Sequence, residues 1–234
     1  MKKALFIAFA ALLYLSVKAQ PAKTSGYLAE IKEELKAVFP KNRTINLVFH
    51  GHSVPTGYWS KSKVHTLESY PHLLLKKLKA EYPYAVINII TTSIGGEWAE
   101  KGQKRFAKDV LPHKPDVIFI DYALNDVGIG LERSEAAWSK MIEEALANQI
   151  KVILVTTSPD QRQDITDPEN VLTKHAEQIR WLAAKYHVGL ADPFAEFQKV
   201  MQKKGSVKKY MSHVNHPNKK GHDIIASQLF TWFR

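Results

Sequence analysis

The chain has 234 residues, 45% of them hydrophobic, which is the length and composition of one compact domain with a sizeable core. It contains no cysteine, so we expect neither disulfides nor a lipid attached through cysteine. The formal net charge of +10 could favour acidic polysaccharides, but the lysines are scattered in pairs with no nucleic-acid-binding motif beside them. We interpret them as a solvated coat and expect no nucleic-acid partner.

The N-terminal residues 1–19 have the pattern of a secretory signal peptide. Two lysines precede an apolar run over residues 4–17, and a small-x-small exit ends at Ala19. An uncleaved anchor is the alternative, but the run is short for a membrane span. We therefore expect a single mature domain, residues 20–234, that is periplasmic or secreted and has no stable membrane anchor after cleavage.

Five short apolar segments rich in β-branched residues follow along the chain, and this pattern is typical of buried parallel strands. The predicted strands are 45–50, 85–90, 116–122, 151–157 and 188–192.

Helical patterns lie between these segments and beside them. Apolar residues recur at helical spacing in four stripes: Tyr70, Leu74, Leu75 and Leu78; Trp138, Met141, Ile142, Ala145 and Leu146; Leu172, His175, Ile179, Leu182 and Tyr186; and Ile225, Leu229 and Trp232. A further helix is expected within 27–39. Repeated strand–helix alternation predicts an α/β fold, a sandwich with a parallel sheet.

The loops that follow the predicted strands carry residues with chemical potential. Ser53 follows the first strand, Gly96 the second and Asn125 the third, while His216 lies just before the last helix. Ligands bind outside the carboxyl ends of such strands, so these residues are expected to converge. Each of them alone could belong to an ordinary turn or helix start.

Together these residue types suit acyl transfer. A serine hydroxyl becomes a nucleophile when a base such as histidine removes its proton. The oxyanion that forms needs preorganised donors, and the N–H groups of Ser53 and Gly96 with the Asn125 amide could supply them.

The order of these motifs resembles the SGNH hydrolases of the GDSL esterase/lipase superfamily, from about Ile45 to the C-terminus. The matching blocks read "FHGHS", "SIGGE", "ALND" and "HVNHPN..GH". The resemblance implies a flavodoxin-like three-layer α/β/α sandwich with a five-stranded parallel sheet. It also implies Ser53 as nucleophile, His216 as base, and Ser53, Gly96 and Asn125 as the oxyanion hole.

Three positions depart from the family pattern. His52 replaces the usual aspartate before the serine, Ala123 replaces a glycine, and His213 stands where the triad aspartate is usual, three residues before His216. Loss of the triad aspartate costs about 10⁴ in turnover in the serine proteases.

What orients His216 is therefore left open. A dyad with Ser53 could operate, with Ser212, Asn215 or a backbone carbonyl holding the ring. A carboxylate could come from another loop, as Asp126 or Asp160, and His52 and His213 could give further support. The third reading is a weak or inactive relative that binds a glycan.

Histidines also raise a metal hypothesis, since His50, His52, His213 and His216 could gather at one mouth. Their spacing lacks a tight ligand signature, so a metal-dependent hydrolase is the outside alternative and we expect neither metal nor cofactor. Our prediction is a secreted serine esterase acting on acyl, and most simply acetyl, esters of a small molecule or carbohydrate.

Overall fold

The computed structural model describes residues 19–234, so the predicted signal peptide, apart from Ala19, lies outside the described residues. Five parallel strands form one sheet in the order β2-β1-β3-β4-β5. The strands are β1 (Thr44–Gly51), β2 (Val86–Thr91), β3 (Val117–Asp121), β4 (Lys151–Val155) and β5 (Gly189–Ala191). Each overlaps a predicted strand, and the order is that of the flavodoxin-like fold, so the predicted fold class is confirmed.

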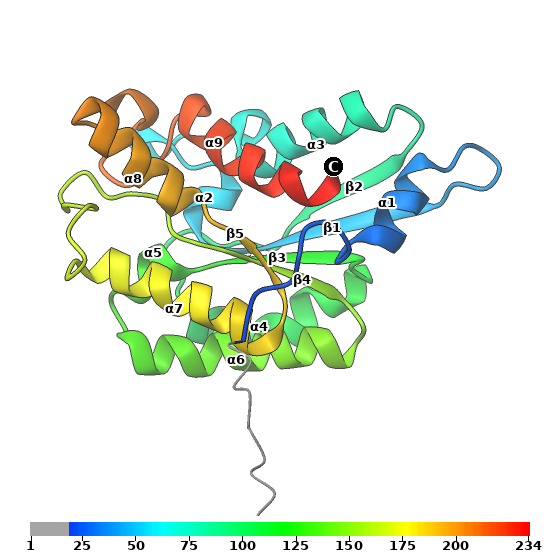
Figure 1. Cartoon of the computed structure of the whole chain (residues 1–234), viewed down its shortest axis with the longest axis horizontal. Coiled ribbons are helices and arrows are strands. Elements are labelled where there is room, and N and C mark those ends of the chain that lie inside the picture. The colour runs from blue at the N-terminus through cyan, green and yellow to red at the C-terminus, as the bar shows by residue number, and fades with distance from the viewer. Residues whose placement is uncertain (1–18) are drawn as a thin grey trace, which may run out of the picture.

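Helices cover both faces of the sheet (Figure 1). Helices α1 (Ala29–Lys36), α3 (Tyr70–Glu81), α8 (Pro193–Lys204) and α9 (Lys219–Phe230) share one apolar core with the sheet. Helices α4 (Ala99–Asp109), α6 (Leu131–Ala147) and α7 (Val171–Tyr186) lie on the opposite face. The short helices α2 (Ser53–Thr56) and α5 (Ala123–Asp126) directly follow β1 and β3. Single 3₁₀ turns occupy Ser60–Ser62, Thr66–Glu68, Leu111–His113, Lys208–Tyr210 and Thr231–Phe233.

Strand β2 differs from the prediction that all five strands are buried. It pairs only with β1 and forms one edge of the sheet, and Val86 keeps 45% of its surface exposed. The apolar run in this segment does not reveal which strand has a neighbour on only one side, because pairing is set by residues distant in sequence.

The carboxyl ends of β1 and β3 lie side by side at the switch in strand order, where α/β folds bind ligands. Gly51 ends β1 directly opposite Asp121, which ends β3. A Cβ atom on Gly51 would lie 2.4 Å from the Asp121 carbonyl oxygen, so only glycine allows this approach. The close pairing brings the residues after Gly51 next to the end of β3.

Candidate active site

Ser53 and His216 meet at this end of the sheet. Ser53 is the first residue of α2, and His216 lies in the turn before α9. The His216 Nε2 atom is 2.9 Å from the Ser53 Oγ atom, which is hydrogen-bond distance. The sheet and the last loop therefore bring the predicted nucleophile and the predicted base into direct contact.

The backbone of His216 is held by a tight turn. Its carbonyl oxygen accepts hydrogen bonds from the Ser212 N–H at 2.9 Å and from the Ser212 hydroxyl at 3.1 Å. Asn218 caps the N-terminus of α9 by accepting from the N–H groups of Lys220 and Gly221. Ser212 thus fixes the main chain of His216 and does not contact its ring.

The imidazole of His216 is half-buried, and its Nδ1 atom has no hydrogen-bond partner among residues 19–234. Burial, together with the neighbouring His52 and His213, lowers the pKa of His216 to about 4. His213 itself is exposed, with its ring centroid 6.2 Å from that of His216. At neutral pH His216 is therefore uncharged and can accept a proton.

Asp126 does not orient His216, because its carboxylate is used elsewhere. It accepts hydrogen bonds from the Ala99 N–H at 2.7 Å, the Ser134 hydroxyl at 2.8 Å and the Trp138 indole N–H at 2.7 Å. The side chain is fully buried, and burial raises the pKa of Asp126. This carboxylate joins α5 to α4 and α6.

Asp160 does not contact His216 either. It is paired with Arg162, whose backbone N–H and Nε atoms lie 2.9 and 3.0 Å from Oδ1. The neighbouring Gln161 bonds the backbone carbonyl oxygens of Val214 and His213, at 2.8 and 2.9 Å. Asp160 thus belongs to the loop that supports the histidine turn from outside.

The loop after β2 is tied to the loop after β3. Gly96 adopts a left-handed conformation, with φ of +76°. The Asn125 side-chain amide donates to the Glu97 carbonyl oxygen at 2.8 Å, and the buried Glu97 carboxylate binds Arg105 and the Tyr122 hydroxyl. One amide hydrogen of Asn125 is left for another acceptor.

Two backbone donors also lie in these loops. Within the described part of the chain, neither the Ser53 N–H nor the Gly96 N–H donates to another protein group. Tyr58 packs against the same loop, since a Cβ atom on Gly95 would lie 3.1 Å from its ring. The ring centroids of Tyr58 and His216 are 6.5 Å apart.

His52 and Asp121 form a buried contact on the inner side of Ser53. The His52 Nδ1 atom is 3.4 Å from the Ser53 Oγ atom and accepts from the Val54 N–H at 3.3 Å. Its Nε2 atom lies 3.3 Å from Asp121 Oδ1, in a contact that lacks the alignment of a good hydrogen bond. Sequence reasoning missed Asp121, although an acid at the carboxyl end of a predicted strand was a usable signal.

The four histidines of the metal hypothesis do not converge. His50 points into the layer beneath α4, where its ring contacts Thr92 Oγ1 at 2.8 Å and the Gly102 carbonyl oxygen at 3.1 Å. Burial lowers the pKa of His50 to about 3. Residues 19–234 contain no group of three or more His, Cys, Asp or Glu residues placed to hold a metal ion.

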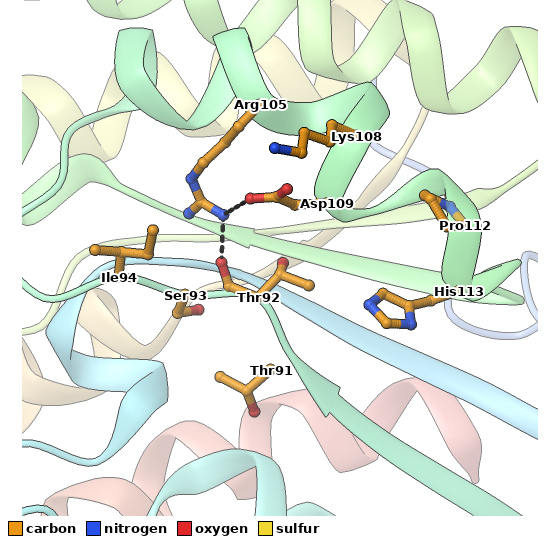
Figure 2. A pocket seen from close by; sticks show the side chains of 9 residues that line it. All are labelled: Thr91, Thr92, Ser93, Ile94, Arg105, Lys108, Asp109, Pro112 and His113. Carbon is orange, nitrogen blue, oxygen red and sulfur yellow. Dashed lines mark hydrogen bonds and ion pairs between the residues drawn. The ribbon is translucent and has the colours of Figure 1, made fainter.

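A cavity of about 250 Å³ adjoins the site and includes Asn125. Its polar walls come from two loops and comprise Asp160, Arg162, Gln163 and Asn215. Figure 2 shows a separate cavity of about 490 Å³ beside the end of β2 and α4, whose lining includes neither Ser53 nor His216. There, the Arg105 guanidinium binds Asp109 at 3.1 Å and the Thr92 carbonyl oxygen at 2.6 Å.

Solved structures with a similar fold include several esterases. A two-domain esterase active on acetylated mannans superposes with a TM-score of 0.70 at 20% identity, over 92% of this chain and 54% of that one. The acetylxylan esterase Axe2 from Geobacillus stearothermophilus gives a TM-score of 0.70 at 21% identity, over 81% of this chain and 94% of that one. The acetyl xylan esterase AlAXEase gives a TM-score of 0.67 at 21% identity, over 80% of this chain and 98% of that one. Likeness at these identities shows a shared fold.

Two sequence comparisons complete this picture. The uncharacterized lipoprotein YqeF of Bacillus subtilis is 35% identical over 82 residues, which are 31% of this chain and 33% of that protein. The chain thus covers a third of this relative and about half of the two-domain esterase. The GDSL-like lipase/acylhydrolase family matches residues 49–224, which include all four sequence blocks quoted above. The chain belongs to this family.

Proposed function

We propose that the chain is a secreted serine esterase that removes acetyl groups from carbohydrate. The observation that carries this proposal is the 2.9 Å contact between His216 Nε2 and Ser53 Oγ at the carboxyl end of the sheet. A neutral histidine within hydrogen-bond reach of a serine hydroxyl is the arrangement that activates a nucleophile. Burial keeps His216 in that neutral form.

The reaction proceeds in two half-reactions. Ser53 Oγ attacks the ester carbon while its proton passes to His216 Nε2, and the tetrahedral oxyanion accepts from the N–H groups of Ser53 and Gly96 and from the Asn125 amide. His216 then gives the proton to the departing alcohol oxygen, leaving an acyl-serine. A water molecule, deprotonated by His216, attacks that acyl group and releases the acid, and the proton returns to Ser53.

Two observations support a sugar acetate as substrate. The esterases of similar fold include enzymes for acetylated mannans and acetylated xylan. The cavity of about 250 Å³ beside Asn125 is lined by Asp160, Arg162, Gln163 and Asn215, whose side chains suit sugar hydroxyls. The N-terminal signal-peptide pattern supports export, and within residues 19–234 no helix is long and apolar enough to cross a membrane.

Release of acetate from acetylated xylan and mannan oligosaccharides by residues 20–234 tests the proposal. Ser53→Ala and His216→Ala should each lower the rate at least about 10³-fold, because both act in every proton transfer. Ser227→Ala and His113→Ala, at exposed positions outside the site, are the matched controls and should leave it unchanged.

The outcomes separate the alternatives. A wild-type chain that binds these oligosaccharides without releasing acetate would support the inactive glycan-binding reading. Full activity in Ser53→Ala would contradict the serine mechanism. Loss of activity after dialysis against a chelator would support the metal-dependent hydrolase instead.

A further inference from the structure

This chain has no carboxylate at the sequence position where the triad aspartate is usual. His213 occupies that sequence position, and the His216 Nδ1 atom has no partner among the described residues. A buried carboxylate nevertheless lies within two contacts of the nucleophile. This carboxylate is Asp121, and His52 stands between it and Ser53.

The hydrogen bonds of His52 define where its proton lies. The Val54 backbone N–H can only donate, and it points at His52 Nδ1, so this nitrogen presents its lone pair. The ring proton is therefore on Nε2, the atom that faces Asp121 Oδ1 at 3.3 Å. A carboxylate can only accept here, which matches this tautomer.

Asp121 and His52 are both buried, and the atoms that face each other have no other polar partner among the described residues. His52 is 0% exposed and Asp121 is 3% exposed. Apart from their mutual contact, neither His52 Nε2 nor Asp121 Oδ1 has a partner among residues 19–234. The other carboxylate oxygen accepts from the Tyr70 hydroxyl at 3.0 Å, and burial raises the pKa of Tyr70, which therefore keeps its proton. Burying a polar atom without a partner costs free energy, so loss of this contact would destabilise both side chains.

From this geometry we propose that Asp121 is the carboxylate that supports catalysis, and that it acts as a positioning residue through His52. By holding the proton on Nε2, Asp121 keeps the Nδ1 lone pair available. That lone pair caps the N-terminus of α2 at Val54 and faces the hydroxyl of Ser53, the first residue of the same helix. The inference rests on the proposed role of Ser53 as nucleophile.

Two consequences follow for the reaction. The cap fixes the start of α2, so Ser53 Oγ stays at 2.9 Å from His216 Nε2. Because Nδ1 accepts from the Val54 N–H, His52 presents a lone pair, and no N–H group, to Ser53 when His216 takes the serine proton. The usual link between the acid and the base is thus replaced by a link between the acid and the nucleophile's helix.

A double-mutant cycle on Asp121 and His52 tests the proposal. In Asp121→Asn, the new amide can donate to His52 Nε2, which moves the ring proton to Nδ1, where it opposes the Val54 N–H. We expect kcat for an aryl acetate and the rate of fluorophosphonate labelling to fall about 10²-fold, with KM changed less than about threefold.

His52→Asn is the informative second variant. Its side-chain carbonyl can cap α2 as the Nδ1 atom does, and it has no tautomer to control. In this background Asp121→Asn should change the labelling rate by less than about threefold. Tyr70→Phe is the matched control, because it removes the other hydrogen bond of Asp121 but leaves the carboxylate facing His52; its loss should stay below about tenfold.

The ring nitrogens of His52 give a readout independent of turnover. In ¹⁵N-detected histidine spectra, the proton should lie on Nε2 in the wild type and on Nδ1 in Asp121→Asn. Equal losses from Asp121→Asn in both backgrounds, or a wild-type proton on Nδ1, would overturn the inference. A wild type that never labels would instead refute the proposed function, while the spectra would still decide the tautomer.

Discussion

At the scale of single residues, the proposed serine mechanism needs a neutral His216, whose Nδ1 atom has no carboxylate partner among the described residues. Burial is the first cause of its lowered pKa, and the two histidines near it, His52 and His213, act in the same direction. The main chain of His216 is held by Ser212, whose N–H and hydroxyl groups both donate to the His216 carbonyl oxygen. Without a carboxylate at Nδ1 the imidazolium form of His216 is not stabilised, and the ring is therefore unprotonated at neutral pH.

The pH dependence of kcat/KM should reflect that environment. With a pKa of about 4, His216 is deprotonated above that pH and loses its function as a base below it. We expect activity toward an aryl acetate to stay level from neutral pH down to about pH 5 and to fall near pH 4, with far-UV circular dichroism confirming that the fold persists.

A matched variant sharpens this test. His213→Ala removes a neighbour that lowers the pKa of His216, so the acid limb should move to higher pH. An acid limb near 6.5 in the wild type, the ordinary value for histidine, would show that burial does not control this ring.

At the scale of elements, the two short helices that follow β1 and β3 carry Ser53 and Asn125, and each helix contacts a buried acid. Asp121 lies under α2, and Asp126 ends α5. Asp126 binds the first N–H of α4 through Ala99 and reaches two side chains of α6. The contacts of Asp126 therefore also hold the preceding residue, Asn125, in place.

Asp126→Ala should lower the free energy of unfolding by about 3 kcal/mol or more, because it leaves buried donors on Ala99, Ser134 and Trp138 without an acceptor. The shift in urea midpoint, at unchanged slope, measures the loss. Asp223→Ala, which removes an exposed ion pair with Lys77, should cost less than about 1 kcal/mol. Equal midpoints for the two variants would show that Asp126 is not an anchor.

At the scale of the whole molecule, the fold was largely predictable. Apolar segments of strand length alternate with helical stripes, and each predicted strand overlaps an observed one, since burial on both faces of a parallel sheet leaves a strong pattern. The exposure of β2 was not predictable in this way. An edge is defined by a missing neighbour, and neighbours in this sheet come from distant parts of the chain.

The site was predictable only in part, for a similar reason. The rule that ligands lie after the strands predicts that Ser53 and His216 converge, and in the structure His216 Nε2 lies 2.9 Å from Ser53 Oγ. It could not assign partners to the carboxylates, because Asp126 and Asp160 bind donors whose positions depend on tertiary packing. Asp121 was overlooked because its contact with His52 depends on the register of β1 and β3.

Reaction of the purified domain, residues 20–234, with a fluorophosphonate probe tests the central claim most directly. The account predicts one covalent adduct per chain, located by peptide mass spectrometry on Ser53, absent from Ser53→Ala and formed at least about 10²-fold more slowly in His216→Ala. A wild-type domain that is folded but does not label, or an adduct on another serine, would contradict it.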